Sequence, residues 1–267
     1  MILYIAGYGR SGSTILDIKL GKKFGFVSLG EVKSLYYEVN HYPSAKCGCG
    51  STYWNCSLWG QIVSSSNLLE KIWMTRIYQS PRFIGFLFYI LYVIRFWCFP
   101  KKSTFLEIVK EAMERVQTQY PDGVYVDSSK TTWFSTRRPA ILSRLGYPIF
   151  VIHIHRPLKD VLASVRSGDN KVLMGDRKKE KPFRVLRAIF SYFFSNLYAA
   201  LLQIKFPYLK ISQIDLRDRE EETFEKIRDF LVQQKLDGHK FYDVSHVVSG
   251  NRLKFSREKS SSDIDTK

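Results

Sequence analysis

The stretch MILYIAGYGRSGSTILD, residues 1–17, decides the fold of this 267-residue chain. A short apolar run, residues 2–6, predicts a buried strand, and the glycine-rich turn 7–14 leads from it into a helical apolar pattern. A strand, a glycine-rich turn and a helix N-terminus together can bind phosphate, because backbone N–H groups and the helix dipole both face the anion. The sequence therefore predicts a phosphate-binding loop at residues 7–14.

This turn differs from the usual nucleotide-binding loop at one position. Gly7, Gly12 and Thr14 fit the pattern G-x-x-x-x-G-K-[ST], but Ser13 stands in place of the lysine. Arg10 is the only cation in the turn. Because the lysine normally reaches the β- and γ-phosphates, the loop suits a phosphate ligand other than ATP. A phosphoryl-transferring NTPase or kinase, which would bind ATP with Mg²⁺, stays the alternative enzyme class.

The rest of the chain alternates short apolar runs with helical patterns. We expect strands at 3–6, 124–126, 149–154 and 209–212, and helices at 13–23, 105–119, 133–145, 158–166, 182–204 and 220–234. This alternation predicts an α/β fold of the P-loop type, with a central parallel sheet flanked by helices. Residues 57–120 contain no convincing strand and are expected to form a helical insert within one domain, residues 1–256. The polar, serine-rich residues 257–267 are expected to be a disordered tail.

Polar residues follow three of the expected strands. Arg10 comes after the first strand, Lys130 lies in DSSK after the second, and Arg156 lies in HIHRP after the third. Ligands of open parallel sheets bind beyond the carboxyl ends of the strands. We therefore expect these three cations to lie within reach of one anionic ligand.

The chain is strongly basic, with 41 Lys and Arg against 25 Asp and Glu and a net charge of +16. This excess suits a polyanionic ligand, nucleic acid or an anionic membrane surface, and it also fits a generally basic, solvated surface. No motif of known nucleic-acid-binding modules is recognisable, so we expect no nucleic-acid partner. A non-enzymatic binder of membrane surfaces or nucleic acid stays a second alternative.

The most apolar segment is FIGFLFYILYVI, residues 83–94. It is shorter than the roughly 20 residues that span a bilayer. It predicts either a buried helix or, over residues 83–99, a membrane-surface helix flanked by basic residues. The start of the sequence has no basic region and no cleavage site of a secretory signal. We therefore expect a cytoplasmic protein, with association to the inner membrane face as a further expectation.

Five segments of the chain resemble the sulfotransferases that use 3′-phosphoadenosine 5′-phosphosulfate, especially the bacterial branch and the tyrosylprotein and glycan enzymes. They are GYGRSGST, SLGEVKSL, VDSSKTT, VIHIHRPLKDVLASVRS and HVVSGNRLKF, and the resemblance extends over residues 1–255. It implies transfer of a sulfonate group from this nucleotide to an acceptor hydroxyl or amine, with no metal required. The aromatic and basic content of residues 57–120 and of the exposed basic loop 168–181 would suit a saccharide, an anionic polymer or a lipid-linked glycan. We therefore expect the acceptor to be a glycan or other carbohydrate-containing molecule, for example a polysaccharide, a lipid-linked glycan or a small-molecule alcohol.

The resemblance also assigns the nucleotide contacts. Arg156 and Ser164 are expected to bind the 3′-phosphate, and Asn251 and Arg252 to close over the 3′-phosphate and the ribose. The loop is expected to hold the 5′-phosphosulfate through Gly9, Arg10, Ser11, Gly12, Ser13 and Thr14. Residues 213–216, QIDL, stand where many relatives have Tyr-Glu-Asp-Leu, so the adenine contact of that tyrosine cannot be carried over.

Three residues are expected to carry the chemistry. Glu31 is the expected base, because sulfonate transfer to a hydroxyl needs an acceptor for its proton. Arg10 and Lys130 are expected to stabilise negative charge on the transferring group. From the residues alone, a glutamate that interacts with a helix dipole and a solvated loop lysine stay open for Glu31 and Lys130.

Three of the four cysteines, Cys47, Cys49 and Cys56, lie in KCGCGSTYWNCSLW. The bacterial branch shows a similar element. Zinc usually takes four ligands, so His41 or Cys98 would have to complete a site. A disulfide is disfavoured in a reducing cytosol. We favour reduced cysteines packed under the acceptor site, and we assign no metal ligand.

Overall fold

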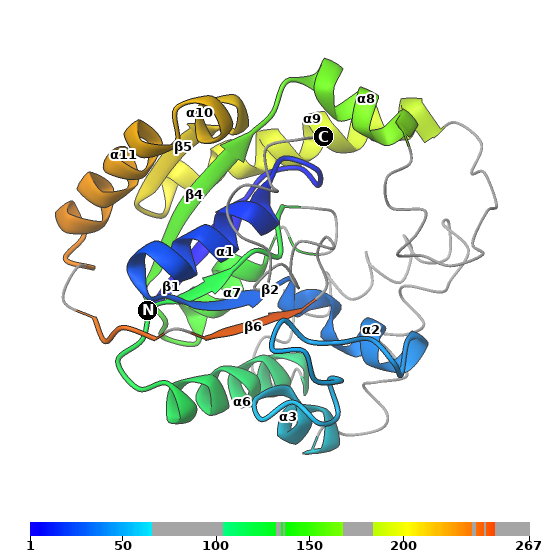
Figure 1. Ribbon diagram of the computed structural model, residues 1–267, viewed down its shortest axis with the longest axis vertical. Helices are drawn as coiled ribbons and strands as arrows, with labels where there is room; N and C mark the ends of the chain where they lie inside the picture. The colour runs from blue at the N-terminus through cyan, green and yellow to red at the C-terminus, as the bar shows by residue number, and fades with distance from the viewer. Residues whose placement is uncertain are drawn as a thin grey trace.

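The structure is a computed structural model that describes residues 1–65, 104–131, 135, 137–167, 184–236, 239–242 and 244–248. Its centre is a parallel sheet of six described strands in the order β5-β4-β1-β3-β2-β6 (Figure 1). The strands are β1 Ile2–Ala6, β2 Val27–Gly30, β3 Tyr125–Asp127, β4 Ile149–His155, β5 Tyr208–Ser212 and β6 Ser245–Val248. The α/β fold expected from the sequence is confirmed.

Helices cover both faces of this sheet. The described α-helices are α1 Ser13–Phe24, α2 Leu35–His41, α3 Trp59–Ser65, α6 Thr104–Gln119, α7 Arg138–Arg144, α8 Leu158–Ser167, α9 Arg184–Leu201, α10 Gln213–Asp218 and α11 Glu220–Gln233. Two short 3₁₀ helices, η1 Val32–Ser34 and η3 Leu202–Ile204, complete the set in the described residues. Figure 1 shows α1 and α11 on the near side of the sheet and α9 behind it. The molecule thus has three layers, helices on either side of one sheet.

The central strand β1 explains why the first apolar run has no polar alternation. Leu3 and Ile5 pack in one core with residues of α1, α10 and α11. Ile2 and Tyr4 point to the opposite face and pack in a second core with residues of α6, α7 and α9. Because successive side chains of a strand alternate between faces, a strand covered on both sides must be apolar throughout.

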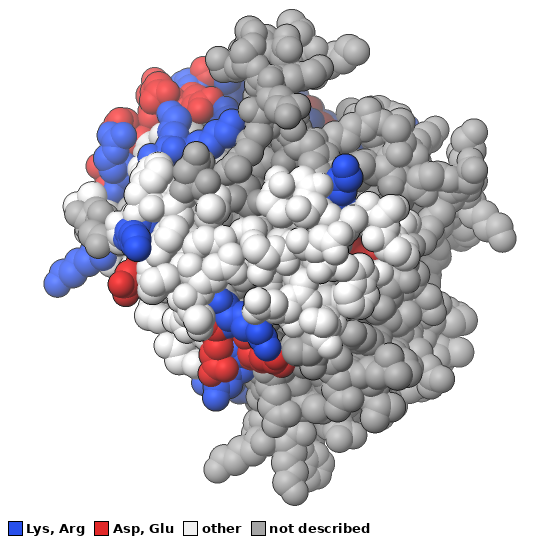
Figure 2. Space-filling model, turned by 60° about the horizontal axis from the view of Figure 1, so that its bottom comes forward, with Lys and Arg blue, Asp and Glu red and all other residues white. Residues whose placement is uncertain are grey.

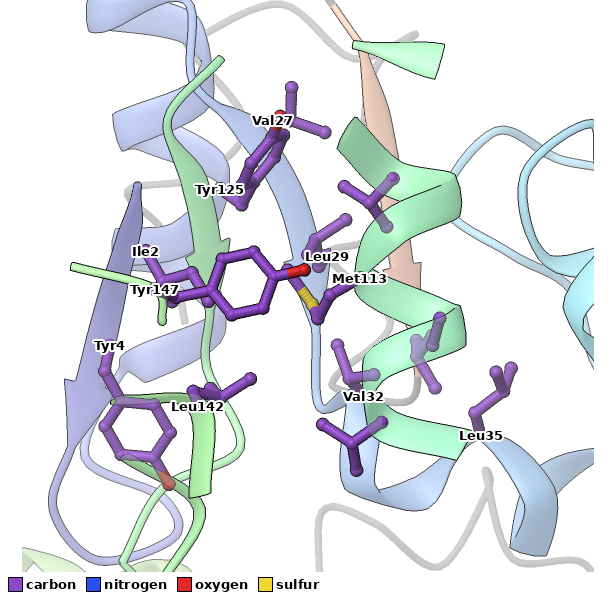
Figure 3. Packing of buried hydrophobic residues seen from close by; sticks show 14 of the residues in the cluster. Ile2, Tyr4, Val27, Leu29, Val32, Leu35, Met113, Tyr125, Leu142 and Tyr147 are labelled. Atoms are coloured by element: carbon purple, nitrogen blue, oxygen red, sulfur yellow. The ribbon is translucent and has the colours of Figure 1, made fainter. Parts of the chain in front are cut away.

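The second core joins helices that are distant in the sequence. Figure 3 shows Met113 of α6 and Leu142 of α7 among side chains of the sheet, including Leu29 of β2 and Tyr125 of β3. The aromatic residues Tyr4 and Tyr147 fill the space between these elements. The helices α3 and α6 both lie within residues 57–120. The described part of residues 57–120 therefore contains helices, as expected. That these residues form an insert stays a prediction.

Most of the expected elements are present with small shifts of their ends. All four expected strands are confirmed, while β2 and β6 were not expected. The helix expected at 133–145 is wrong in its first part, since Ser135 lies in a turn and α7 begins at Arg138. Pro139 explains the later start: it is tolerated in the first turn of a helix, but it would break a helix that began at 133.

Several expectations fall on residues that the structure does not describe. They are the apolar segment 83–99, the basic loop 168–181, Asn251 with Arg252, and the tail 257–267. Among the helices that are described, none is both long and apolar enough to cross a membrane. The cytoplasmic location and the membrane-surface helix therefore stay predictions.

The described charges do not gather into one basic surface on the face drawn in Figure 2. There, basic and acidic side chains lie in mixed groups around a largely uncharged centre. Some of the described basic residues are paired with acidic residues of the same helix, for example Lys110–Glu114 and Arg115–Glu111 on α6. The net charge of +16 therefore does not by itself mark a docking surface for a polyanion on the described part of this face.

Candidate active site

The glycine-rich loop follows β1 and is fixed against its neighbours. Gly7 has φ +128°, and a Cβ atom there would lie 2.4 Å from the backbone oxygen of Ile154 in β4. The Gly7 N–H donates to the Thr131 hydroxyl, 3.1 Å away, and that hydroxyl in turn donates to the Ser195 carbonyl of α9 at 2.7 Å. Only glycine fits at this position, because both the backbone angle and the close approach exclude a side chain.

The loop ends at the start of α1, where the structure has the features of an anion site. Gly12 precedes the helix with φ 83° and offers no side chain to cap it. The first N–H groups of a helix have no acceptor within the helix, so they need water or a ligand. Next to them, the Ser11 hydroxyl is buried and has no hydrogen-bond partner among the described residues. A phosphate group would satisfy both requirements.

Arg10, Arg156 and Ser164 come together beside this loop. The Arg10 guanidinium donates to the Ser164 carbonyl at 2.8 Å and to the Ser164 hydroxyl at 2.9 Å. Arg156 donates to the Arg10 carbonyl at 2.9 Å, while its Nε is buried without a partner in the described part of the chain. Tyr192 of α9 holds the Arg156 backbone by donating to its carbonyl at 2.9 Å. Arg10 thus lies with the pair predicted for the 3′-phosphate.

Glu31 and Lys130 form an ion pair at the ends of β2 and β3. Both side chains are largely buried, with 15% and 12% of their surfaces exposed. The backbone of Lys130 is fixed by hydrogen bonds from Tyr4 and Ser135 to its carbonyl. The Glu31 N–H donates to the Val248 carbonyl of β6 at 2.8 Å. The structure therefore brings together the expected base and one of the two expected charge-stabilising cations.

Lys33 is a second cation of this group, which we did not identify from the sequence. Its ammonium lies 3.4 Å from the Ser135 hydroxyl, and its backbone N–H donates to the Ser129 hydroxyl at 3.3 Å. The pKa of Lys33 is lowered to about 8, mainly by desolvation and also by the nearby Lys130, while Glu31 opposes the shift. A lysine two residues after an expected base was the available signal.

Two buried carboxylates hold the strand ends in place. Asp127 pairs with Arg138 at 2.5 Å and accepts the Ser129 N–H at 2.9 Å, which fixes the segment that carries Lys130. Asp17 of α1 accepts hydrogen bonds from the Ser128 hydroxyl at 2.7 Å and the Gly30 N–H at 3.2 Å. Burial raises the pKa of Asp17 to about 7. These contacts connect the loop helix to the ends of β2 and β3.

The three clustered cysteines meet a residue that the sequence did not suggest. Their fourth neighbour is His246 of β6, and we call this group the Cys₃His cluster: Cys47, Cys49, Cys56 and His246. The two expected candidates for a fourth ligand, the side chain of His41 and Cys98, lie outside the described parts of the structure. The three cysteines are not joined by disulfides. Hydrogen bonds, first from Cys47 and then from His246, lower the pKa of Cys56 to about 4.

Helix α10 lies close to the loop. A Cβ atom on Gly12 would lie 3.2 Å from Cγ of Gln213, the first residue of this helix. The Ser212 hydroxyl caps α10 by accepting the Ile214 N–H at 3.1 Å. The predicted contacts of Asn251 and Arg252 with the nucleotide stay predictions.

Comparison with known proteins gives no family for the chain. No family model and no curated protein matches it. Solved structures that match include the sulfotransferase domain from the curacin biosynthetic pathway, at 18% identity and TM-score 0.48 over 87% of this chain and 73% of that one. The sulfotransferase domain of the Synechococcus PCC 7002 olefin synthase matches at 18% identity and TM-score 0.45, over 86% and 72%. Both similarities are too low to assign a function, which has to come from the residues of the site.

Proposed function

We propose that the protein is a sulfotransferase that moves the sulfonate group of 3′-phosphoadenosine 5′-phosphosulfate to an acceptor hydroxyl or amine. The observation that carries the proposal is the Glu31–Lys130 ion pair. It lies at the carboxyl ends of the strands, where the glycine-rich loop also follows β1. A base paired with a cation next to a phosphate-binding loop is suited to transfer between an anionic donor and a hydroxyl.

Two candidate anion sites support the proposal of a nucleotide that has both a 3′-phosphate and a 5′-phosphate. The loop suits the 5′-phosphate, because the Ser11 hydroxyl has no hydrogen-bond partner among the residues that the structure describes. The Arg156 Nε has no partner within the described ranges, and together with Arg10 and Ser164 this arginine suits the 3′-phosphate. ATP lacks a 3′-phosphate and would leave the second site unused. The absence of the loop lysine argues against ATP as well.

The proposed reaction is a direct displacement at sulfur. The acceptor oxygen forms a new S–O bond while the S–O bond to the 5′-phosphate breaks, and the electron pair of that bond stays on the phosphate. Glu31 takes the acceptor proton as the new bond forms. We assign Lys130 and Lys33, which lie near Glu31, to the charge on the sulfonate and on the leaving phosphate. Arg10, which was expected to take part in this step, contacts Ser164 and is assigned to the 3′-phosphate site instead. The loop and the arginine pair hold the donor in one orientation.

We propose a glycan or other carbohydrate-containing acceptor, such as a polysaccharide, a lipid-linked glycan or a small alcohol. The acceptor proposal rests on the aromatic and basic content of residues 57–120 and 168–181 in the sequence. Labelled sulfate transfer to fractions of a cell extract, followed by identification of the product, tests it directly. Label found only on protein tyrosine would contradict a carbohydrate acceptor.

Calorimetry separates the proposed function from its alternatives. We expect 3′-phosphoadenosine 5′-phosphate to bind without metal, and ATP with Mg²⁺ to bind far more weakly. Tight, Mg²⁺-dependent ATP binding would instead support a kinase or NTPase. Binding of neither nucleotide would contradict the proposal and favour a non-enzymatic binder.

A further inference from the structure

The Cys₃His cluster joins three parts of the chain at the outer edge of the sheet. Cys47 and Cys49 lie in a small hairpin, closed by the bridge between Lys46 and Thr52 and by the Cys47 N–H bond to the Ser51 carbonyl at 2.8 Å. Cys56 lies just before α3, and the histidine belongs to β6. One ligand-type atom from each residue, three Sγ and the His246 Nδ1, lies within 4.8 Å of all the others.

The distances in the cluster are those of a tetrahedral site. Cys56 Sγ lies 3.6 Å from Cys47 Sγ and 3.8 Å from Cys49 Sγ. The His246 Nδ1 lies 3.3 Å from Cys56 Sγ and 3.7 Å from Cys47 Sγ. Zn–S bonds of about 2.3 Å and a Zn–N bond of about 2.0 Å at tetrahedral angles place S···S at about 3.8 Å and S···N at about 3.5 Å. A disulfide would need about 2.05 Å between two sulfurs.

The surroundings supply the second layer that metal ligands usually have. The other ring nitrogen of the histidine, Nε2, lies 2.5 Å from the Tyr120 hydroxyl, which fixes the ring with Nδ1 towards the sulfurs. The Trp59 N–H points at Cys56 Sγ at 3.5 Å, as a donor to a thiolate does. Cys47, Cys56 and His246 are almost fully buried, at 0%, 3% and 4% exposure. Thiolates in such a place need a cation.

We propose that the Cys₃His cluster binds one Zn²⁺ in a structural site. Three thiolates and one imidazole fill all four positions of a tetrahedral zinc, which leaves no position for substrate or water. Binding releases to solvent the protons of those cysteine thiols that are still protonated, and it changes no oxidation state. The site does not depend on the proposed sulfonate transfer, which requires no metal at the reacting atoms.

The proposed ion would fasten the edge strand β6 to the body of the protein. Two hydrogen bonds already connect the cysteine segment to this strand: Gly48 N–H to the Val247 carbonyl at 3.1 Å and Trp59 Nε1 to the His246 carbonyl at 2.7 Å. The strand in turn accepts the Glu31 N–H at Val248. A metal at the cluster would therefore stabilise the edge of the sheet next to the proposed base.

Metal analysis of the full chain, purified without a histidine tag, tests the site. We expect about one equivalent of zinc per chain, and below about 0.2 equivalents in Cys47→Ser, Cys56→Ser and His246→Asn. Cys98→Ser serves as the matched control and should keep its zinc. Loss of zinc in that control would overturn the assignment of the four ligands.

A second measurement on the unmodified protein covers the case in which the variants do not fold. After removal of zinc, Co²⁺ should restore the thermal midpoint and give the intense visible absorption of a tetrahedral cobalt–thiolate site. Folded protein with below about 0.1 equivalents of zinc and no such cobalt spectrum would overturn the proposal. So would thiol titration showing a disulfide among the three cysteines. Each result is read without any transfer assay, so a failure here is distinct from a failure of the proposed function.

Discussion

The two sides of the candidate site are held in different ways. On the β4 side, the loop is fixed by backbone geometry: Gly7 faces the Ile154 carbonyl with no space for one more carbon atom. On the β2 side, Glu31 is held by the charge of Lys130 and by a backbone bond to the edge strand β6. The comparison indicates that the position of the loop depends on the close fit of its backbone. The position of Glu31 depends instead on its ion pair and on the pairing of β6 with β2.

The largest expected effect tests the dependence on shape. Gly7→Ala forces a left-handed backbone angle on alanine and a collision with a backbone oxygen, which should lower the free energy of unfolding by about 3 kcal/mol or more. Gly9→Ala is the matched control, because a Cβ atom at Gly9 meets nothing within 4 Å. Chemical denaturation of both variants measures the difference. Equal stability of the two would refute a sterically closed loop.

Glu31→Gln tests the dependence on charge with almost no change of shape. We expect turnover with the donor nucleotide and a verified acceptor to fall about 10²- to 10⁴-fold, because the amide cannot take the proton. The affinity for 3′-phosphoadenosine 5′-phosphate should change less than about twofold, because the phosphate contacts lie on the other side of the site. Glu114→Gln, at an exposed position of α6, is the control. Full turnover of Glu31→Gln would remove the base assignment.

Arg156→Ala separates the two anion sites on the β4 side. Loss of a charged donor should weaken binding of 3′-phosphoadenosine 5′-phosphate about 10- to 100-fold. Adenosine 5′-phosphate, which lacks the 3′-phosphate, should bind the variant and the unmodified protein alike. Arg166→Ala, on the exposed side of α8, controls for loss of positive charge. An equal loss for both nucleotides in calorimetry would place Arg156 at the 5′-phosphate instead.

The remaining test concerns Asp17, which links the two sides. Its pKa in the folded protein is raised from 3.8 to about 7, so the folded state binds more protons than the unfolded state between these pH values. This carboxyl therefore makes the free energy of unfolding fall as pH rises from about 4 to 7, by at most about 1.4 kcal/mol per pH unit. Asp17→Asn should remove that fall.

Urea unfolding at pH 5, 6 and 7 measures this effect. Relative to the unmodified protein, Asp17→Asn should gain stability as the pH rises, whereas the exposed control Asp229→Asn should follow the unmodified protein. Parallel pH profiles for Asp17→Asn and the unmodified protein would contradict the raised pKa.

Contiguous segments made much of the β4 side predictable. The apolar run Ile2–Ala6 predicts a strand, and the glycines directly after it predict a loop. Arg156 and Ser164 were paired through the sequence resemblance, in which one continuous segment contains both residues, eight positions apart. Glu31 and Lys130 are 99 residues apart, so no local pattern connects them. For Lys130, the argument from the sequence was that the carboxyl ends of parallel strands lie together, which brings it near Arg10 and Arg156.

The β2 side was harder to predict because its elements are short and polar. The strand β2 has the sequence VSLG and β6 has SHVV, and neither shows a run or an alternation long enough to indicate a strand. His246 could not be assigned to the cysteines, since the two lie 199 residues apart and no pattern connects them. Tertiary pairing alone brings such residues together.

The position of β6 at one edge of the sheet also constrains the order of events during synthesis. Cys47 leaves the ribosome 199 residues before His246, so at about 5–20 residues per second these two residues are made roughly ten to forty seconds apart. For that time the hairpin has its thiols but no partner strand, and β2 has an open edge. The outer part of the sheet can therefore close only after β6 has been made, when the loop side has already had time to form.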